Sequence, residues 1–203
     1  MPKHLPLLTL LLLATLAGCR TPPATLPTLY GNGALPRVAA AQPVRLDEYR
    51  APPELAGLRG DGEISHTGGN GWRQWLFGDA DTRLKVTLYG LPGGWEDLSA
   101  TRIVSGHYGH LRQQRVNRVY NSADQSIRFL HERLFDLEGR ITASGTYLIN
   151  RPNRRPLHET LLLTLAGDHF VRLETASRER DTRDLLRLSK RALAEFKAYQ
   201  GER

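Results

Sequence analysis

Apolar side chains recur at every second position in several segments of the middle of the chain, and this constrains the fold more than any other feature. Leu84, Val86 and Leu88 alternate in this way, as do the apolar positions within residues 127–135 and 141–149. A β-strand turns successive side chains to opposite faces, so a period of two is typical of strands with one buried face. The sequence therefore predicts a sheet.

Short turn signals separate the alternating segments. Gly78-Asp79, Glu138-Gly139 and Gly167-Asp168 combine glycine with an acidic residue, which is the composition of tight turns between antiparallel strands. The first pair is expected to join two strands within residues 72–91 into a hairpin, with Trp75 and Phe77 facing the core. The stretch NRPNRRP, residues 150–156, is predicted as a loop.

Two segments have helical spacing instead. The last, from Asp181 to Gln200, carries apolar residues three and four apart, with Asp181 or Thr182 as the expected cap. An earlier helix is expected to start near His110 and end near Ala123, because Gly106 and Gly109 disfavour helix before that point. Its expected buried stripe contains Tyr108, Leu111, Val116, Val119 and Tyr120.

These elements predict an α+β domain: an antiparallel β-sheet with helices packed against it, including a helix at the carboxyl end. The order of hairpins, inserted helix, meander and closing helix loosely resembles the α/β/α sandwiches of PsbP-like proteins. This resemblance concerns architecture and rests on no motif, so it implies no function.

The first residues have the layout of an export signal. Lys3 and His4 are followed by a mostly apolar run from Leu5 to Leu16, and small residues follow the run. Twelve helical residues rise only about 18 Å, whereas a membrane span needs roughly 20 apolar residues. Residues 1–18 are therefore predicted to be a signal peptide.

The chain holds a single cysteine, Cys19, directly after this run. The tetrapeptide Leu16-Ala17-Gly18-Cys19 resembles the lipobox of bacterial lipoprotein precursors. The resemblance implies cleavage between Gly18 and Cys19, a diacylglycerol on the Cys19 sulfur and an acyl chain on the new amino terminus. Two or three acyl chains make attachment stable, so Cys19 is expected to be a lipid anchor, and no other cofactor is predicted.

The segment after the cysteine, residues 19–45, is rich in proline and is expected to be an extended tether. Residues 46–203 are long enough for a single domain with its own core. Aspartate after the lipobox cysteine favours retention in the inner membrane, and Arg20 departs from that signal. The resemblance therefore points to the outer membrane, with the domain facing the periplasm.

The formal net charge is +7, and arginine supplies most of the positive charge. A possible basic face contains arginines of both predicted helices: Arg112, Arg115, Arg183, Arg187 and Arg191. Such a face fits anionic lipid, the phosphates of lipopolysaccharide or an acidic envelope protein, although a solvated helix surface has the same pattern. Nucleic acid is not an expected partner, because an exported chain does not meet it.

His107 and His110 are weak candidates for metal ligands, because residues three apart on a helix share one side. His131 with Glu132, or His158 with Glu159, would supply the third ligand.

Two tryptophans lie where they could contribute to a ligand site, and the usual catalytic motifs are missing from the sequence. Trp72 and Trp95 adjoin glycine-rich loops, where they either anchor the loops or form the rim of a ligand site. The sequence contains neither a GxSxG elbow nor an HExxH motif, so no catalytic residue is predicted.

Two hypotheses follow from the sequence. The first is a membrane-anchored lipoprotein, facing the cell envelope, whose domain binds or interacts without catalysis. The alternative is a domain that binds a small molecule or a metal around His107 and His110, with or without hydrolytic activity.

Overall fold

The computed structural model describes residues 45–66, 71–122 and 124–201, all of which belong to one unit of the chain, residues 35–203. The predicted signal peptide, residues 1–18, lies outside the described residues. The same holds for Cys19 and for the tether except its last residue, Arg45.

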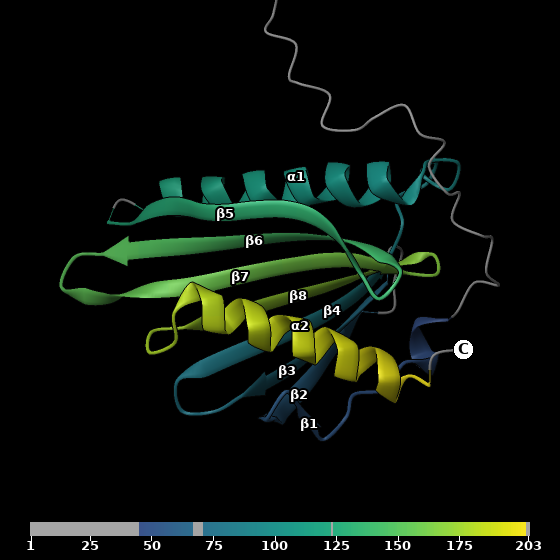
Figure 1. Ribbon diagram of the computed structural model, residues 1–203, viewed down its shortest axis with the longest axis horizontal. Helices are drawn as coiled ribbons and strands as arrows, with labels where there is room; N and C mark the ends of the chain where they lie inside the picture. The colour runs from purple at the N-terminus through teal and green to yellow at the C-terminus, as the bar shows by residue number, and fades with distance from the viewer. Residues whose placement is uncertain (1–44, 67–70, 123, 202–203) are drawn as a thin grey trace, which may run out of the picture. The chain divides into compact units, whose positions relative to one another are not determined.

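Eight strands form one antiparallel sheet in the order β1-β2-β3-β4-β8-β7-β6-β5 (Figure 1). The strands are β1 (Glu54–Leu55), β2 (Leu58–His66), β3 (Trp72–Gly78), β4 (Thr82–Gly90), β5 (Ser126–Leu137), β6 (Arg140–Arg151), β7 (Arg154–Ala166) and β8 (His169–Ser177). A 3₁₀ turn, η1 (Leu46–Glu48), precedes them, and the helices are α1 (Ala100–Tyr120) and α2 (Thr182–Tyr199). The α+β class, the antiparallel sheet and the carboxyl-terminal helix are confirmed.

The expected hairpins are present, because their turns are encoded locally. β3 and β4 pair across residues 79–81, and two-residue turns join β5 to β6 and β7 to β8. The predicted loop at residues 150–156 is wrong, since only Pro152 and Asn153 turn the chain there. Asn153 has a φ of 58°, a left-handed conformation that asparagine tolerates, so both strands continue up to the turn.

The first helix differs from its prediction. α1 begins at Ala100, ten residues before His110, and the Ser99 hydroxyl caps it by accepting from the backbone N–H of Arg102. Ile103 and Val104 in its first turns are completely buried against the sheet. This burial outweighs the cost of about 1 kcal/mol for each glycine in the helix. Tyr120 was expected on the buried stripe but is exposed.

α2 agrees with its prediction. The Asp181 carboxylate accepts from the backbone N–H of Asp184 and caps the helix. Leu185, Leu188, Ala192 and Phe196 are buried on one side. Neither helix of the described residues is long and apolar enough to cross a membrane.

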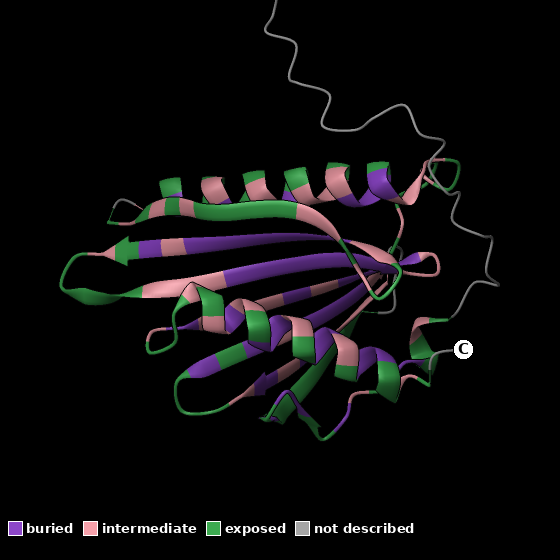
Figure 2. Ribbon diagram, viewed as in Figure 1, coloured by how far each residue is buried: buried purple, intermediate pink, exposed green. Residues whose placement is uncertain are grey.

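The two helices cover opposite faces of the sheet. α1 packs mainly on β5, β6 and β7, and α2 packs on β6, β7 and β8 (Figures 1 and 2). In β7, Leu162 belongs to the core under α2, whereas Leu161 and Leu163 belong to the core under α1. The central strands are therefore buried on both faces, as Figure 2 shows for β6, β7 and β8.

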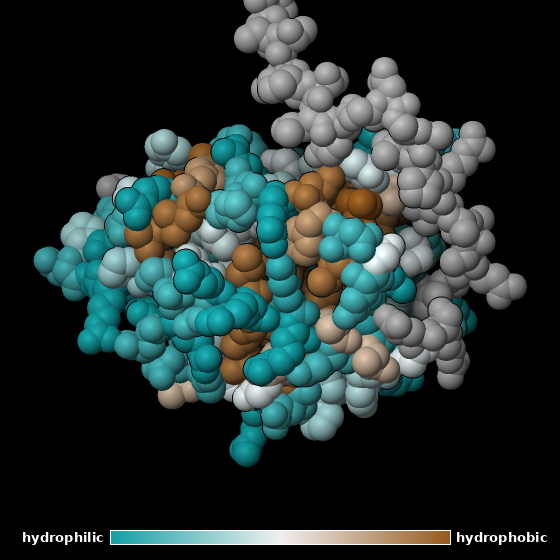
Figure 3. Space-filling view, in the orientation of Figure 1, coloured by the Kyte–Doolittle hydropathy of each residue, from teal (hydrophilic) through white to brown (hydrophobic). Residues whose placement is uncertain are grey.

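The view toward α2 shows a mainly hydrophilic surface, on which hydrophobic side chains appear as separate patches (Figure 3). The arginines of α2 contribute to its polar side: Arg183 and Arg187 are exposed.

A glycine allows α1 to approach β6 closely. The hydroxyls of Tyr108 from α1 and Tyr147 from β6 meet 2.6 Å apart directly above Gly145. A Cβ atom at position 145 would overlap with both hydroxyl groups. Gly145 therefore provides the space for this contact between helix and sheet.

Replacing Gly145 by alanine is expected to lower the free energy of unfolding by about 1–3 kcal/mol, because the two tyrosines must move apart. The matched control is Gly109→Ala, since nothing lies within 4 Å of a Cβ there. An exposed helical glycine changed to alanine should raise stability by about 0.5–1 kcal/mol. Urea unfolding shows whether Gly145→Ala lowers the free energy of unfolding and Gly109→Ala raises it. Equal changes in the two variants would contradict the close packing at Gly145.

Candidate functional site

The face of the sheet opposite α2 is only partly covered by α1. Side chains of β3, β4 and β8 on this face therefore lie beside the helix and form the floor of a groove. Trp72 of β3 is paired with Tyr89 of β4, and Gln74 is paired with Thr87. On the other edge of β4, Thr87 is paired with Arg172 of β8.

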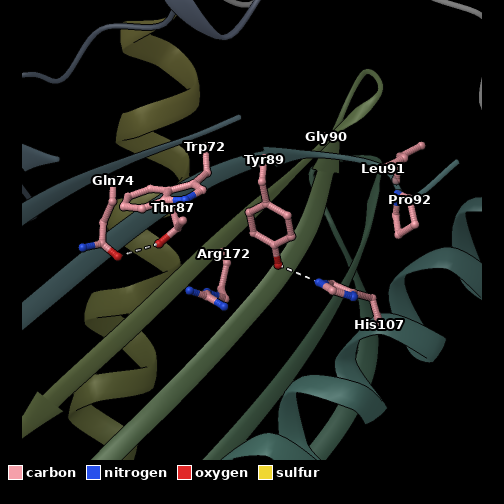
Figure 4. Close-up of a pocket in the computed structure, with 9 residues that line it drawn as sticks. All are labelled: Trp72, Gln74, Thr87, Tyr89, Gly90, Leu91, Pro92, His107 and Arg172. Atoms are coloured by element: carbon pink, nitrogen blue, oxygen red, sulfur yellow. Dashed lines mark hydrogen bonds between the residues drawn. The ribbon is translucent and has the colours of Figure 1, made fainter. Parts of the chain in front are cut away.

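A pocket of about 390 Å³ opens at this place (Figure 4). The residues that line it are Trp72, Gln74, Thr87, Tyr89, Gly90, Leu91, Pro92, His107 and Arg172. Tyr89 stands at its centre with the hydroxyl pointing to His107, while Trp72, Gln74 and Thr87 lie on the other side (Figure 4). The volume lies within the range of small-molecule sites, roughly 300–1,000 Å³.

His107 forms the wall that α1 contributes. Its Nε2 lies 2.7 Å from the Tyr89 hydroxyl, and its ring stacks on Phe170 with 4.2 Å between centroids. Burial, together with the charges of His110 and Arg172, lowers the pKa of His107 to about 4. The imidazole is therefore neutral at pH 7 and binds the phenol as a neutral partner.

Tyr89 is held in its protonated form. Burial raises the pKa of its phenol to about 12, although the positive charge of Arg172 opposes this rise. The Arg172 guanidinium lies 5.6 Å from the centre of the Tyr89 ring. The aromatic side of the pocket is thus uncharged, and its nearest charge is a cation.

Below the pocket, a chain of ion pairs connects α1 to the sheet. Arg115 of α1 donates to Glu159 of β7 at 2.5 Å and to Glu174 of β8 at 2.8 Å. Glu174 also contacts Lys85 at 2.9 Å and Arg172 at 3.6 Å. Burial alone would raise the pKa of Glu174, but the charges of Arg172, Lys85 and Arg115 lower it to about 2.

A second polar cluster lies along α1, next to this chain of ion pairs. The Tyr108 hydroxyl donates to Glu132 at 2.7 Å, and both carboxylate oxygens of Glu132 accept from Arg112 at 3.0 Å. Burial and the Tyr147 hydroxyl raise the pKa of Tyr108 far above its ordinary value. Burial likewise raises the pKa of Tyr147, to about 12, so this cluster holds two neutral phenols and one ion pair.

The two candidate metal ligands, His107 and His110, lie in different surroundings. His107 lines the pocket, whereas His110 is exposed and interacts with Gln114 of its own helix at 2.8 Å. Among the described residues, no group of three His, Cys, Asp or Glu side chains is placed to hold a metal ion.

The expected third ligands lie elsewhere. Strand alternation places His131 and His158 on the face of the sheet that α2 covers, because their neighbour Thr160 bonds to Ser189 of α2. Glu132 and Glu159 share the face of α1, but each is bound to an arginine.

The five arginines of the predicted basic face do not form one surface. α1 and α2 lie on opposite faces of the sheet, which separates Arg112 and Arg115 from the others. Arg115 is buried in its ion pairs, and Arg112 is bound to Glu132. On α2, Arg183, Arg187 and Arg191 share a helix, but Arg187 pairs with Asp184 and Arg191 donates to the carbonyl of Ala56.

The tryptophans have different roles. Trp72 lines the pocket, as a ligand rim would require. Trp95 packs edge-on against His107 and Phe170, with centroids 6.1 and 6.4 Å apart, so it supports the wall from behind. Sequence reasoning missed Arg172 and Glu174, although their alternation with buried Val171 and Leu173 signals a strand with charges on its second face.

Comparisons with known proteins identify no family for this chain. No family model matches the sequence, and no curated protein matches it either. The solved structures that match this chain include the cyanobacterial PsbP (CyanoP) of Synechocystis sp. PCC 6803, at 16% identity and a TM-score of 0.43. That match covers 66% of this chain and 80% of CyanoP.

PA94, a protein of unknown function from Pseudomonas aeruginosa, matches at 9% identity and a TM-score of 0.37. The match covers 66% of this chain and 83% of PA94. Likenesses at this level carry no function to the present chain, so the pocket must be interpreted from its own residues.

The His107 environment predicts a pH dependence of stability. A histidine with a pKa of 6.5 in the unfolded chain and about 4 in the folded chain takes up its proton first in the unfolded state. Folding stability therefore falls as the pH decreases from 7 toward 4. His107→Gln keeps a hydrogen-bonding side chain but does not titrate. Between pH 7 and 5, its free energy of unfolding should therefore fall by about 1–2 kcal/mol less than that of wild type.

Urea unfolding at the two pH values measures this difference. Equal losses in wild type and His107→Gln would contradict a neutral, buried His107.

Proposed function

We propose that this chain is a lipoprotein anchored by Cys19, facing the cell envelope, whose domain binds a small molecule in the pocket beside α1 without catalysis. The observation that carries the binding role is the pocket itself. It combines an aromatic wall with a few polar groups, and this composition is typical of ligand sites.

The bonding of the pocket's polar groups supports binding rather than catalysis. Thr87 donates to Gln74 at 3.4 Å, and Tyr89 is bonded to His107. The raised pKa of Tyr89 and the lowered pKa of His107 keep both groups neutral near pH 7. These groups therefore shape the site and accept or donate hydrogen bonds. They are proposed to bind a ligand without catalysing a reaction.

The anchor rests on the tetrapeptide Leu16-Ala17-Gly18-Cys19. With Arg20 after the cysteine, we place the mature protein in the outer membrane, with its domain in the periplasm. An envelope protein, anionic lipid or lipopolysaccharide is the further partner proposed for its basic side chains, and nucleic acid is not.

Mass spectrometry of the protein purified from whole cells solubilised in detergent tests both parts of the proposal. Under denaturing conditions, wild type should carry the mass of the lipid on Cys19, and under native conditions an additional organic ligand. Cys19→Ala should lose the lipid mass and the membrane association but keep the ligand. Trp72→Ala should lose the ligand, because the wall of the pocket is removed, and keep the lipid.

Each variant thus serves as the control of the other. Wild type without a lipid mass would refute the anchor. A bare protein in the native spectrum would refute the small-molecule site and favour a domain that interacts with an envelope protein.

A further inference from the structure

We propose that the pocket beside α1 takes a planar aromatic anion, with the ring against Trp72 and Tyr89 and the anionic group at Arg172. This inference rests on the proposed function, whose binding site it uses, and it specifies the chemical class of the ligand.

The ring end is defined by two aromatic side chains at paired positions. Trp72 and Tyr89 face the pocket from neighbouring strands, and both are only partly buried. Leu91 and Pro92 add apolar surface beyond Tyr89 (Figure 4). Flat rings stack on such side chains, and an aromatic pair is worth about 0.5–1.5 kcal/mol beyond the area that it buries.

The anionic end is defined by Arg172. Its guanidinium lies between the aromatic end and the ion pairs below it, and its nearest carboxylate, Glu174, is 3.6 Å away. That distance is too long for a hydrogen bond, and the Nε that faces Glu174 is buried. The side chain as a whole is 22% exposed and lines the pocket, so its accessible part can meet a ligand. An arginine in this position can donate to a carboxylate or sulfonate.

The charges around Arg172 favour an anion. Three cations, Lys85, Arg115 and Arg172, share Glu174, and the other carboxylate of the network is Glu159. Three positive charges face two negative ones, so one positive charge is left uncompensated. The neighbouring hollow adds Arg83 and Arg118 against Asp61, which leaves a further positive charge.

Gln74 completes the polar side of the pocket. Its Oε1 accepts from Thr87, which directs its amide nitrogen away from Thr87 (Figure 4). A cationic ligand would be repelled by Arg172 at this place, and a neutral ring would leave the surplus positive charge of the network uncompensated. The class that matches both ends is therefore an aromatic ring with an acidic substituent.

Two probes with the same ring system test this assignment. 2-Naphthoate carries a carboxylate, and 2-naphthamide is its neutral analogue of nearly the same shape. The full chain is titrated with each by isothermal calorimetry in nanodiscs of zwitterionic phosphatidylcholine, and the heat of empty discs is subtracted. We expect one site that binds naphthoate at least tenfold more tightly than naphthamide.

Three variants locate the binding. Arg172→Gln should reduce the affinity for naphthoate to that for naphthamide, and Trp72→Ala should weaken both probes. Arg187→Gln removes an exposed arginine of α2 on the other side of the sheet and should leave both affinities unchanged. If Arg172→Gln does not fold, Gln74→Leu, which leaves the ion pairs intact, should weaken naphthoate more than naphthamide, because a hydrogen bond to a carboxylate is stronger than one to a neutral amide.

Equal affinity for the two probes would overturn the assignment, as would the absence of naphthoate binding. An unchanged naphthoate affinity in folded Arg172→Gln, or in Gln74→Leu when Arg172→Gln does not fold, would do the same. These failures are distinct from failure of the proposed function, because a ligand retained in the native mass spectrum and lost in Trp72→Ala would still show a binding pocket.

Discussion

One buried guanidinium determines how the helix and the sheet of this protein fit together. The side chain of Arg115 is only 7% exposed and reaches from α1 to Glu159 and Glu174 on two adjacent strands. It also lies over the ring of Tyr147, with 4.8 Å to the centroid. A charge in this position is costly unless it is fully paired, so α1 can occupy its place only where both carboxylates are within reach.

The position of α1 in turn creates the pocket. With Arg115 fixed two helical turns further on, His107 lies against Phe170 and Tyr89 and closes one side of the cavity. Glu174 links the same network to Arg172, which is the cation of the proposed binding site. The interaction that stabilises the fold and the group that selects the ligand therefore belong to one set of charges.

The sequence predicted those parts of the structure that depend on neighbouring residues. The turns at Glu138-Gly139 and Gly167-Asp168 and the cap at Asp181 are local, and they were confirmed. The start of α1 was misplaced because burial of distant surfaces outweighs the local effect of glycine, and β2 was missed because its residues are mostly exposed. The pocket could not be predicted, since residues 89, 107 and 172 meet only through the strand order β4-β8-β7 and the packing of α1.

A double-mutant cycle between Arg115 and Glu174 tests most directly whether this ion pair organises the molecule. Arg115→Met, Glu174→Gln and the combined variant are unfolded with urea, and the coupling energy follows from the four free energies of unfolding. If the ion pair has this role, we expect a favourable coupling of about 2 kcal/mol or more, with each single variant more destabilised than an exposed ion pair would explain. A coupling near zero would contradict this role, because the ion pair between Arg115 and Glu174 would then contribute nothing to holding α1 on the sheet.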